Sequence, residues 1–136
     1  MQDNINNNTH YRIMLIDDER DIITTFKEGL EGSGFSVTAF QNPFEALATF
    51  KKSNEKTYDL LLIDIRYDGL DIDGFQLYQE LRNSGKKLPP VCFITAFEEY
   101  YDRIKHLSPE IDVKCFIRKP IQMVDLIARL KQELQA

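Results

Sequence analysis

Three carboxylates, a hydroxyl and an amine stand at or just beyond the ends of four apolar runs in this chain. Asp17 and Asp18 follow the first run, Asp64 the second, Thr95 ends the third, and Lys119 comes shortly after the fourth. If the runs are parallel strands of one sheet, their carboxyl ends share an edge and these side chains converge. Clustered carboxylates repel one another unless a hard cation lies among them, and oxygen ligands suit Mg²⁺. The combination indicates phosphoryl chemistry on a carboxylate, with the hydroxyl and the ammonium binding phosphoryl oxygens.

Each of these residues also has an ordinary interpretation when it is taken alone. Asp18 could cap a helix, Asp64 could be a loop acid, and Lys119 could be a surface lysine. Thr95 could simply begin a helix. All four strand ends carry a suitable group in a suitable order, and this joint pattern favours the chemical interpretation.

The elements that must position these residues alternate along the chain from Tyr11 onward. Apolar runs and one period-two segment predict five strands, at 12–16, 35–40, 59–64, 91–95 and 113–117. Helical spacing of apolar residues predicts helices near 22–30, 43–50, 75–81, 98–107 and 121–134. Right-handed crossovers between such units give a parallel sheet with helices on both faces, an α/β fold. We expect residues 1–10, which are polar and Asn-rich, to be a disordered segment before one domain at 11–136.

Composition and charge narrow the class of protein. The chain is 43% apolar and 29% charged, and its 17 basic and 22 acidic side chains give a net charge of −5. This balance disfavours direct binding to nucleic acid or to an anionic membrane surface. No apolar run has the length of a membrane span, and the first residues lack the order of a signal peptide. We therefore expect a cytoplasmic protein.

The two cysteines, Cys92 and Cys115, lie inside apolar runs. We expect reduced core thiols, as is usual in the cytoplasm. A disulfide is conceivable if their strands are neighbours, but it is the less favoured alternative. Their spacing and the isolated histidines do not match a zinc site.

At these motifs the chain resembles the receiver domain of two-component response regulators, of the stand-alone, chemotaxis-response-regulator-like kind. The matching motifs are Leu15-Ile16-Asp17-Asp18-Glu19, Leu62-Ile63-Asp64-Ile65, Phe93-Ile94-Thr95-Ala96 and Phe116-Ile117-Arg118-Lys119-Pro120. The resemblance covers about Tyr11 to Leu134. It implies a flavodoxin-like, doubly wound five-stranded parallel sheet of order 2-1-3-4-5 with five flanking helices.

The resemblance also implies a phosphoacceptor and a metal site. Asp64 would take a phosphoryl group from a sensor histidine kinase or a phosphotransfer protein. Mg²⁺ would be held by Asp18 and Asp64 directly, by Asp17 largely through water, and by the backbone carbonyl of Arg66. The protein would then be a phosphoacceptor switch rather than an enzyme with a separate substrate.

Further residues would report the phosphorylation. Thr95 would swing toward the phosphoryl group, Lys119 would pair with it, and Phe116 would fill the space that Thr95 leaves. The surface formed by 98–107, 113–117 and the closing helix would change, and it would bind an unknown downstream protein or join two copies. Onward phosphotransfer in a relay is the other output. Ala96 matches a position where a small side chain leaves the phosphoryl group reachable.

The segment after the acceptor departs from the family pattern. Tyr67 and Asp68 stand where the family usually has Met-Pro, and Gly74 comes ten residues after Asp64 instead of eight. The loop at 66–73 is therefore longer by two and lacks a proline. The Arg66 guanidinium could clamp the phosphoryl group and slow hydrolysis, or it could face solvent.

Aromatic residues after Thr95 leave two interpretations open. Phe97, Tyr100 and Tyr101 could be core and rim packing, or one or two could anchor a partner or a second copy. Phe97 is also a candidate modulator of the phosphoryl site.

Two rival functions compete with the single-domain receiver, which has no output domain in this chain. A Mg²⁺-dependent phosphohydrolase would need another acid or base near Asp64 and a cap domain. A pseudo-receiver would bind partners without phosphorylation. The complete set of acids with Thr95 and Lys119 argues against the second rival, and the altered loop argues for it.

Overall fold

The computed structural model describes residues 10–100, 103 and 115–135, and within them five parallel strands form one sheet. The strands are β1 (Arg12–Ile16), β2 (Ser36–Phe40), β3 (Leu60–Asp64), β4 (Val91–Thr95) and β5 (Cys115–Arg118). Their order is β2-β1-β3-β4-β5, so the predicted doubly wound sheet is confirmed.

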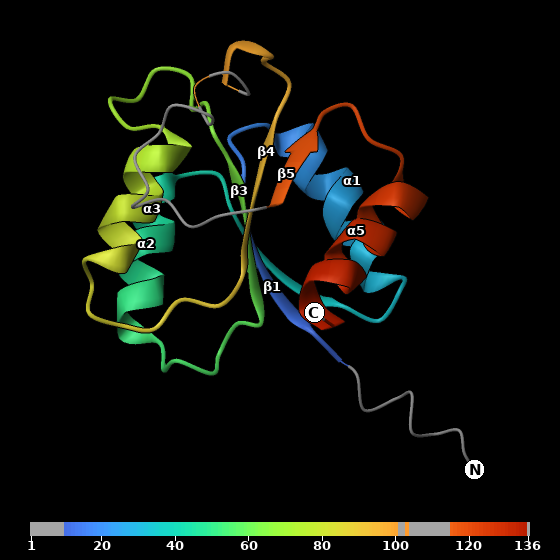
Figure 1. The fold of residues 1–136 in the computed structure, drawn as a ribbon, viewed down its shortest axis with the longest axis horizontal. Helices are drawn as coiled ribbons and strands as arrows, with labels where there is room; N and C mark the ends of the chain where they lie inside the picture. The colour runs from blue at the N-terminus through green and yellow to red at the C-terminus, as the bar shows by residue number, and fades with distance from the viewer. Residues whose placement is uncertain (1–9, 101–102, 104–114, 136) are drawn as a thin grey trace.

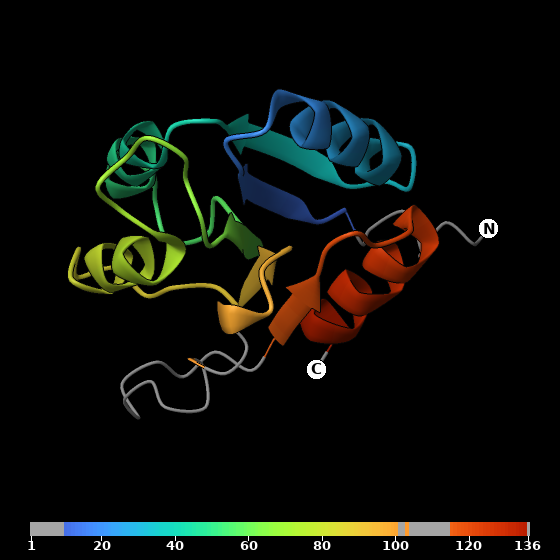
Figure 2. The ribbon, with the colours of Figure 1, turned by 90° about the horizontal axis from the view of Figure 1, so that it is seen from above.

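Helices cover both faces of this sheet. They are α1 (Arg20–Glu31), α2 (Pro43–Lys52), α3 (Gly74–Arg82) and α5 (Met123–Gln135). Figures 1 and 2 show α2 and α3 on one face and α1 and α5 on the other. Of the helix predicted at 98–107, Glu99, Tyr100 and Arg103 are helical, and the rest lies outside the described residues.

Alternation along the strands divides the core into two layers. In β1, Ile13 and Leu15 pack toward α1 and α5, whereas Met14 and Ile16 pack toward α2 and α3. Every residue of β3 and β4 is buried because both of their faces are covered. These two central strands therefore hold the residues at their carboxyl ends on a rigid base.

Short polar side chains cap the starts of two helices. Asn42 caps α2 by accepting hydrogen bonds from the backbone N–H of Phe44 and Glu45. Asp73 and Gln76 form a reciprocal capping box at the start of α3. This box fixes the residue at which the loop after β3 ends. It does so without the proline that could otherwise stiffen the loop.

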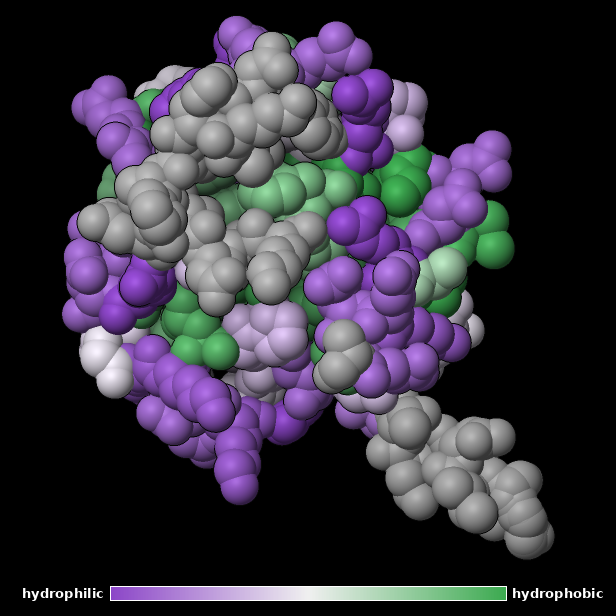
Figure 3. Space-filling view, viewed as in Figure 1, coloured by the Kyte–Doolittle hydropathy of each residue, from purple (hydrophilic) through white to green (hydrophobic). Residues whose placement is uncertain are grey.

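The molecular surface agrees with the charge balance of the sequence. In the view of Figure 3, hydrophilic side chains dominate the periphery and hydrophobic ones show between them. Among the described residues, the exposed large hydrophobic side chains are Phe44, Leu70, Phe97 and Val124. No helix in the described part of the chain is long and apolar enough to cross a membrane.

The expectation of two reduced thiols is wrong for this structure, in which Cys92 and Cys115 form a disulfide. The two cysteines are direct partners in the β4–β5 ladder, with Cα atoms 4.6 Å apart. Both side chains point to the same face of the sheet, where a bond between them is geometrically feasible. The sequence alone could not show that the two strands pair in this register.

Candidate functional site

The acidic residues after β1 and β3 form one cluster at the carboxyl edge of the sheet. Ile16 pairs with Ile63 in the parallel ladder, so Asp17 and Asp64 are the next residues along the two strands. Carboxylate oxygens of Asp17, Asp18 and Asp64 lie within 4.8 Å of one another. Asp17 and Asp64 are buried, and Asp18 is half-buried. The predicted convergence of these three residues is present.

Lys119 enters the same cluster from the end of β5. Its Nζ donates a hydrogen bond to Oδ2 of Asp17 at 2.9 Å and lies 3.6 Å from Oδ1 of Asp64. The backbone N–H of Lys119 donates to the carbonyl of Thr95 at 2.9 Å, which ties the lysine to the end of β4. Its side chain is only 7% exposed. Lys119 is thus a buried partner of two carboxylates and not a surface lysine.

Burial shifts the protonation of the cluster. It raises the pKa of Asp64 to about 8, assisted by repulsion from Asp17 and opposed by Lys119. It also raises the pKa of Asp17, although the Glu19 N–H and Lys119 favour the ionised form. For Lys119, burial lowers the pKa, but attraction to Asp64 and Asp17 outweighs it and raises the pKa overall. One ammonium therefore does not compensate the negative charge gathered here.

The donor set fits a hard divalent cation. All three carboxylates offer oxygen ligands, and they converge where more positive charge would be stabilising. Asp18 is available for this role because it does not cap α1: the N-cap is Glu19, which makes no side-chain cap bond.

Thr95 lies on β4, the strand next to that of Asp64, and Phe116 lies on β5, one strand further along the sheet. Thr95 is buried at the end of β4, one position beyond the Asp64–Ile94 pair, and its Oγ1 accepts a hydrogen bond from the Phe97 N–H at 3.2 Å. The half-buried ring of Phe116 stacks on Phe93, with centroids 5.5 Å apart. Ala96, between Thr95 and Phe97, is exposed.

The loop after β3 is held by contacts that replace the missing proline. The Asp68 N–H donates to Oδ2 of Asp18 at 2.8 Å. Arg66 pairs with Asp68 at 3.3 Å, and its guanidinium lies 4.4 Å from the centre of the Phe97 ring. Arg66 therefore links this loop to the loop after β4. Tyr100 packs on Phe97, and Tyr101 lies outside the described residues.

Three features of the site escaped the sequence analysis. Glu19 approaches Lys119 at 3.6 Å, and only its place directly after the acid pair hinted at this. Tyr67 is buried, and its hydroxyl is the one buried side-chain polar atom of the described residues without a hydrogen-bond partner. Gly74 packs against the Asp64 backbone, a contact that no side-chain pattern encodes.

Comparisons with known proteins agree with this geometry. The family model described as "Response regulator receiver domain" matches residues 13–131. The regulatory protein VanRc of Enterococcus gallinarum is 35% identical over 127 residues, which are 91% of this chain and 50% of the relative. The transcriptional regulatory protein PcoR of Escherichia coli is 31% identical over 124 residues, 91% of this chain and 51% of the relative. The chain thus spans about half the length of these curated relatives.

Solved structures show the same architecture. A two-component response regulator from Clostridium difficile matches with a TM-score of 0.77 and 26% identity, covering 92% of this chain and 96% of that one. The receiver domain of the hybrid histidine kinase CckA matches with a TM-score of 0.70 and 30% identity, covering 91% and 99%. Taken with the family match, the ordered sheet and the acidic cluster, these findings place the chain in the family of response regulator receiver domains.

Proposed function

We propose that this receiver is a phosphorylation-controlled switch whose acceptor is Asp64. The arrangement that carries the proposal is the buried Asp64 carboxylate with Lys119 Nζ at 3.6 Å and two further carboxylates beside it. A sensor histidine kinase or a phosphotransfer protein would supply the phosphoryl group. The proposed setting is the cytoplasm, and the proposed receiver unit is 11–136 after a lead-in at 1–10.

The transfer begins with the ionised form of Asp64. A carboxylate oxygen attacks phosphorus, the phosphorus–nitrogen bond of the donor phosphohistidine breaks, and the imidazole leaves with the bonding electrons and takes up a proton. Lys119 is close enough to bind an oxygen of the new acyl phosphate. Mg²⁺, held by Asp17, Asp18, Asp64 and the carbonyl of Arg66, would neutralise charge on the phosphoryl oxygens when bound.

The phosphoryl group is then sensed by Thr95. Its Oγ1 would leave the Phe97 N–H and donate a hydrogen bond to a phosphoryl oxygen, and Phe116 would move into the space that opens. The surface around β5 and α5 would change for a downstream protein, a relay partner or a second copy. Exposed Ala96 leaves the site reachable, while Arg66 and Phe97 modulate access to it.

The receiver acts in this proposal as a switch and binds no nucleic acid itself. The names of VanRc and PcoR describe regulators about twice as long as the matched region, so their complete activities belong to those proteins. A phosphohydrolase is the less supported rival, because it would need a further acid or base near Asp64. In the described part of the site, the acids and Lys119 described above already have roles in the receiver proposal, and no additional group is left for hydrolysis.

Phosphorylation can be tested directly by intact-mass measurement. Incubation with acetyl phosphate and Mg²⁺ should give one acid-stable, base-labile phosphoryl adduct. Asp64→Asn and a chelator should abolish it, whereas Asp71→Asn, which changes an exposed loop acid, should leave it unchanged. If neither a small phosphodonor nor a cognate kinase gives an adduct, the proposal is wrong. Turnover of many phosphoesters would favour the hydrolase, and partner binding without any adduct would favour the pseudo-receiver.

A further inference from the structure

The Cys92–Cys115 disulfide joins the two strands that carry the switch residues. Cys92 lies three residues before Thr95, and Cys115 lies four residues before Lys119. The next pair in the ladder is Phe93 and Phe116, whose rings stack on the opposite face of the sheet. The covalent link is therefore adjacent to the aromatic pair that the proposed switch must rearrange.

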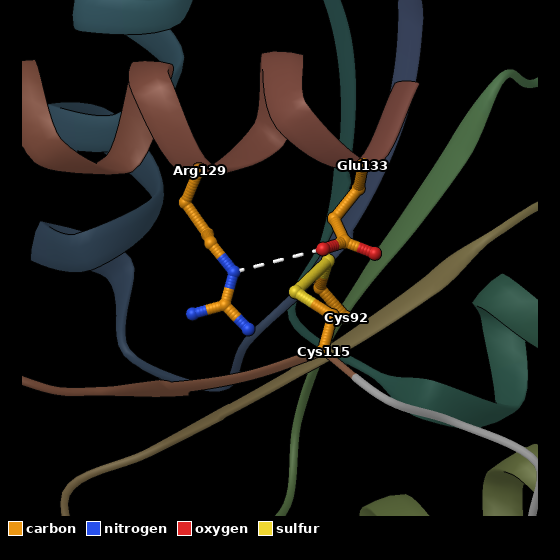
Figure 4. Close-up of a disulfide and its surroundings, with 4 residues drawn as sticks. All are labelled: Cys92, Cys115, Arg129 and Glu133. Carbon is orange, nitrogen blue, oxygen red and sulfur yellow. Dashed lines mark ion pairs between the residues drawn. A yellow bond between two sulfur atoms is a disulfide. The ribbon is translucent and has the colours of Figure 1, made fainter. Parts of the chain in front are cut away.

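The disulfide is buried beneath α5, with two charged side chains of that helix close to it. The cysteines are 0% and 1% exposed, and they lie in the core layer beneath α5. Figure 4 shows the Glu133 carboxylate beside the sulfur atoms, with Arg129 reaching it from the preceding turn at 3.7 Å. A carboxylate oxygen of Glu133 is within 4.8 Å of both sulfurs. Arg129 and Glu133 are partly exposed, so they stand between the disulfide and water.

We propose that Cys92 and Cys115 form a reversible thiol–disulfide switch that limits how far phosphorylation can change the β4–β5 region. The regulatory half of this inference rests on the proposed function, and the redox couple does not. In a reducing cytoplasm a disulfide is more often a transient, sensing bond than a permanent structural one.

Reduction proceeds by thiol–disulfide exchange with a dithiol reductant. A reductant thiolate attacks one protein sulfur and forms a mixed disulfide, and the other cysteine leaves as a thiolate that is then protonated. The second reductant thiol displaces the first protein sulfur. The products are two protein thiols and one oxidised reductant, and the balance is two electrons and two protons.

Access requires local opening at the last turns of α5, since both sulfurs are buried. The Glu133 carboxylate repels both the incoming thiolate and the one that leaves, and its ion pair with Arg129 offsets only part of this repulsion, so it slows exchange. The switch is thus protected from rapid reduction while the helix end is closed.

Oxidation links β4 to β5 by a covalent bond. The bond closes a sequence separation of 23 residues, a segment that contains Thr95. With β4 and β5 linked one position from Phe93 and Phe116, sliding or separation of the two strands is opposed. Phosphorylation of the oxidised receiver should therefore move β5 and α5 less than phosphorylation of the reduced one.

The redox couple is tested on the full chain without any phosphodonor. The protein is equilibrated in mixtures of reduced and oxidised dithiothreitol and alkylated. Intact mass spectrometry then counts the free thiols, and circular dichroism is recorded in parallel. Two thiols should appear together while the folded spectrum persists. Failure to form the bond at any ratio, or reduction only together with unfolding, would overturn the proposal.

The route to the disulfide is tested by the rate of reduction. Glu133→Gln should speed it a few-fold, because one negative charge beside the sulfurs is removed in a setting that water partly screens. Asp125→Asn, the same charge change at the other end of α5, should leave the rate as it is. Equal rates in all three proteins would refute the gating role of Glu133.

The regulatory half is tested by hydrogen exchange across β5 and α5 with acetyl phosphate and Mg²⁺. The reduced protein should show the larger change on phosphorylation, and the Cys92→Ala, Cys115→Ala double variant should match it in either redox buffer. Equal changes in oxidised and reduced protein would overturn the regulation. Absence of a phosphoryl adduct in both states would instead overturn the proposed function together with its regulation, while the equilibration experiment still decides the redox couple.

Discussion

Gly74 lies so close to Asp64 that no side chain fits between them. A Cβ at Gly74 would stand 2.6 Å from the Asp64 carbonyl oxygen, and the Gly74 N–H donates to the carbonyl of Ile65. The first residue of α3 is therefore packed directly on the end of β3. The longer loop keeps its glycine at the structurally required place, although the spacing from Asp64 is ten residues.

Gly74→Ala should destabilise the protein by about 1–3 kcal/mol, the range for a buried steric clash that the backbone must relieve. It should also lower the extent of phosphorylation, because the Asp64 backbone would shift. Chemical denaturation and adduct mass are the measurements. Gly32→Ala is the matched control, since its backbone is right-handed helical (φ −63°) and it lies far from the site. Equal stability of the two variants would contradict the close-packing argument.

Stability without a divalent cation should fall as the pH rises from about 5 to 8. The pKa of Asp64 is raised to about 8 in the folded protein and is near 3.8 when unfolded, so the folded state binds the extra proton in this window. The slope should be about 1 kcal/mol per pH unit. The raised pKa of Lys119 acts only at higher pH, where its contribution is lost.

Urea unfolding in chelator across this pH range measures the slope. Asp64→Asn should flatten it, and Asp71→Asn should not. Mg²⁺ should stabilise the wild type more at pH 8 than at pH 6, because the cation competes with the proton. A stability that rises with pH in chelator would refute the assignment.

Tyr67→Phe should stabilise the protein by about 1 kcal/mol. The Tyr67 hydroxyl is buried with no partner among the described residues, and removing an unsatisfied polar atom removes its desolvation penalty. Burial, followed by the charge of Asp64, raises the pKa of this phenol, so it stays neutral. Thermal or urea unfolding measures the change in stability. Tyr78→Phe is the control, and it should not increase the stability. A loss of stability in Tyr67→Phe would mean that the hydroxyl has a partner such as a bound water.

Arg66→Ala should shorten the lifetime of the phosphoryl group a few-fold while lowering stability by less than about 1 kcal/mol. The guanidinium bridges two loops through Phe97 and Asp68, and exposed cation–π contacts and ion pairs contribute little to stability. We expect this bridge between the loops after β3 and β4 to hinder attack by water at Asp64, so its loss should speed hydrolysis. Decay of the adduct after donor removal is the readout, and Arg20→Ala on exposed α1 is the control. An unchanged lifetime would favour the solvent-facing alternative for Arg66.

Much of the site could be predicted because side-chain type and strand ends encode it. The runs before Asp17, Asp64 and Thr95 are apolar since both sheet faces are covered, and this pattern locates the shared edge. Asn42 and Asp73 stand at helix starts for a similarly local reason, because short polar side chains satisfy the free N–H groups there.

The remaining features depend on register and on backbone atoms. Cys92 meets Cys115 only because β4 and β5 pair at that position, and nothing local to either cysteine indicates it. The loop after β3 is anchored by the N–H of Asp68, a group that every residue except proline carries. The loop lacks a proline, and this backbone hydrogen bond constrains it instead.

Because of that hydrogen bond, the Asp18 carboxylate has two partners to serve, the loop and the proposed cation. Oδ2 of Asp18 accepts the Asp68 N–H, and the same carboxylate is a proposed ligand of the cation. Charge drawn toward a bound ion would weaken the bond to the amide, so filling the site should loosen the outer loop before any phosphoryl group arrives. A kinase that docks on this loop would then distinguish a receiver that is ready for transfer from one that is not.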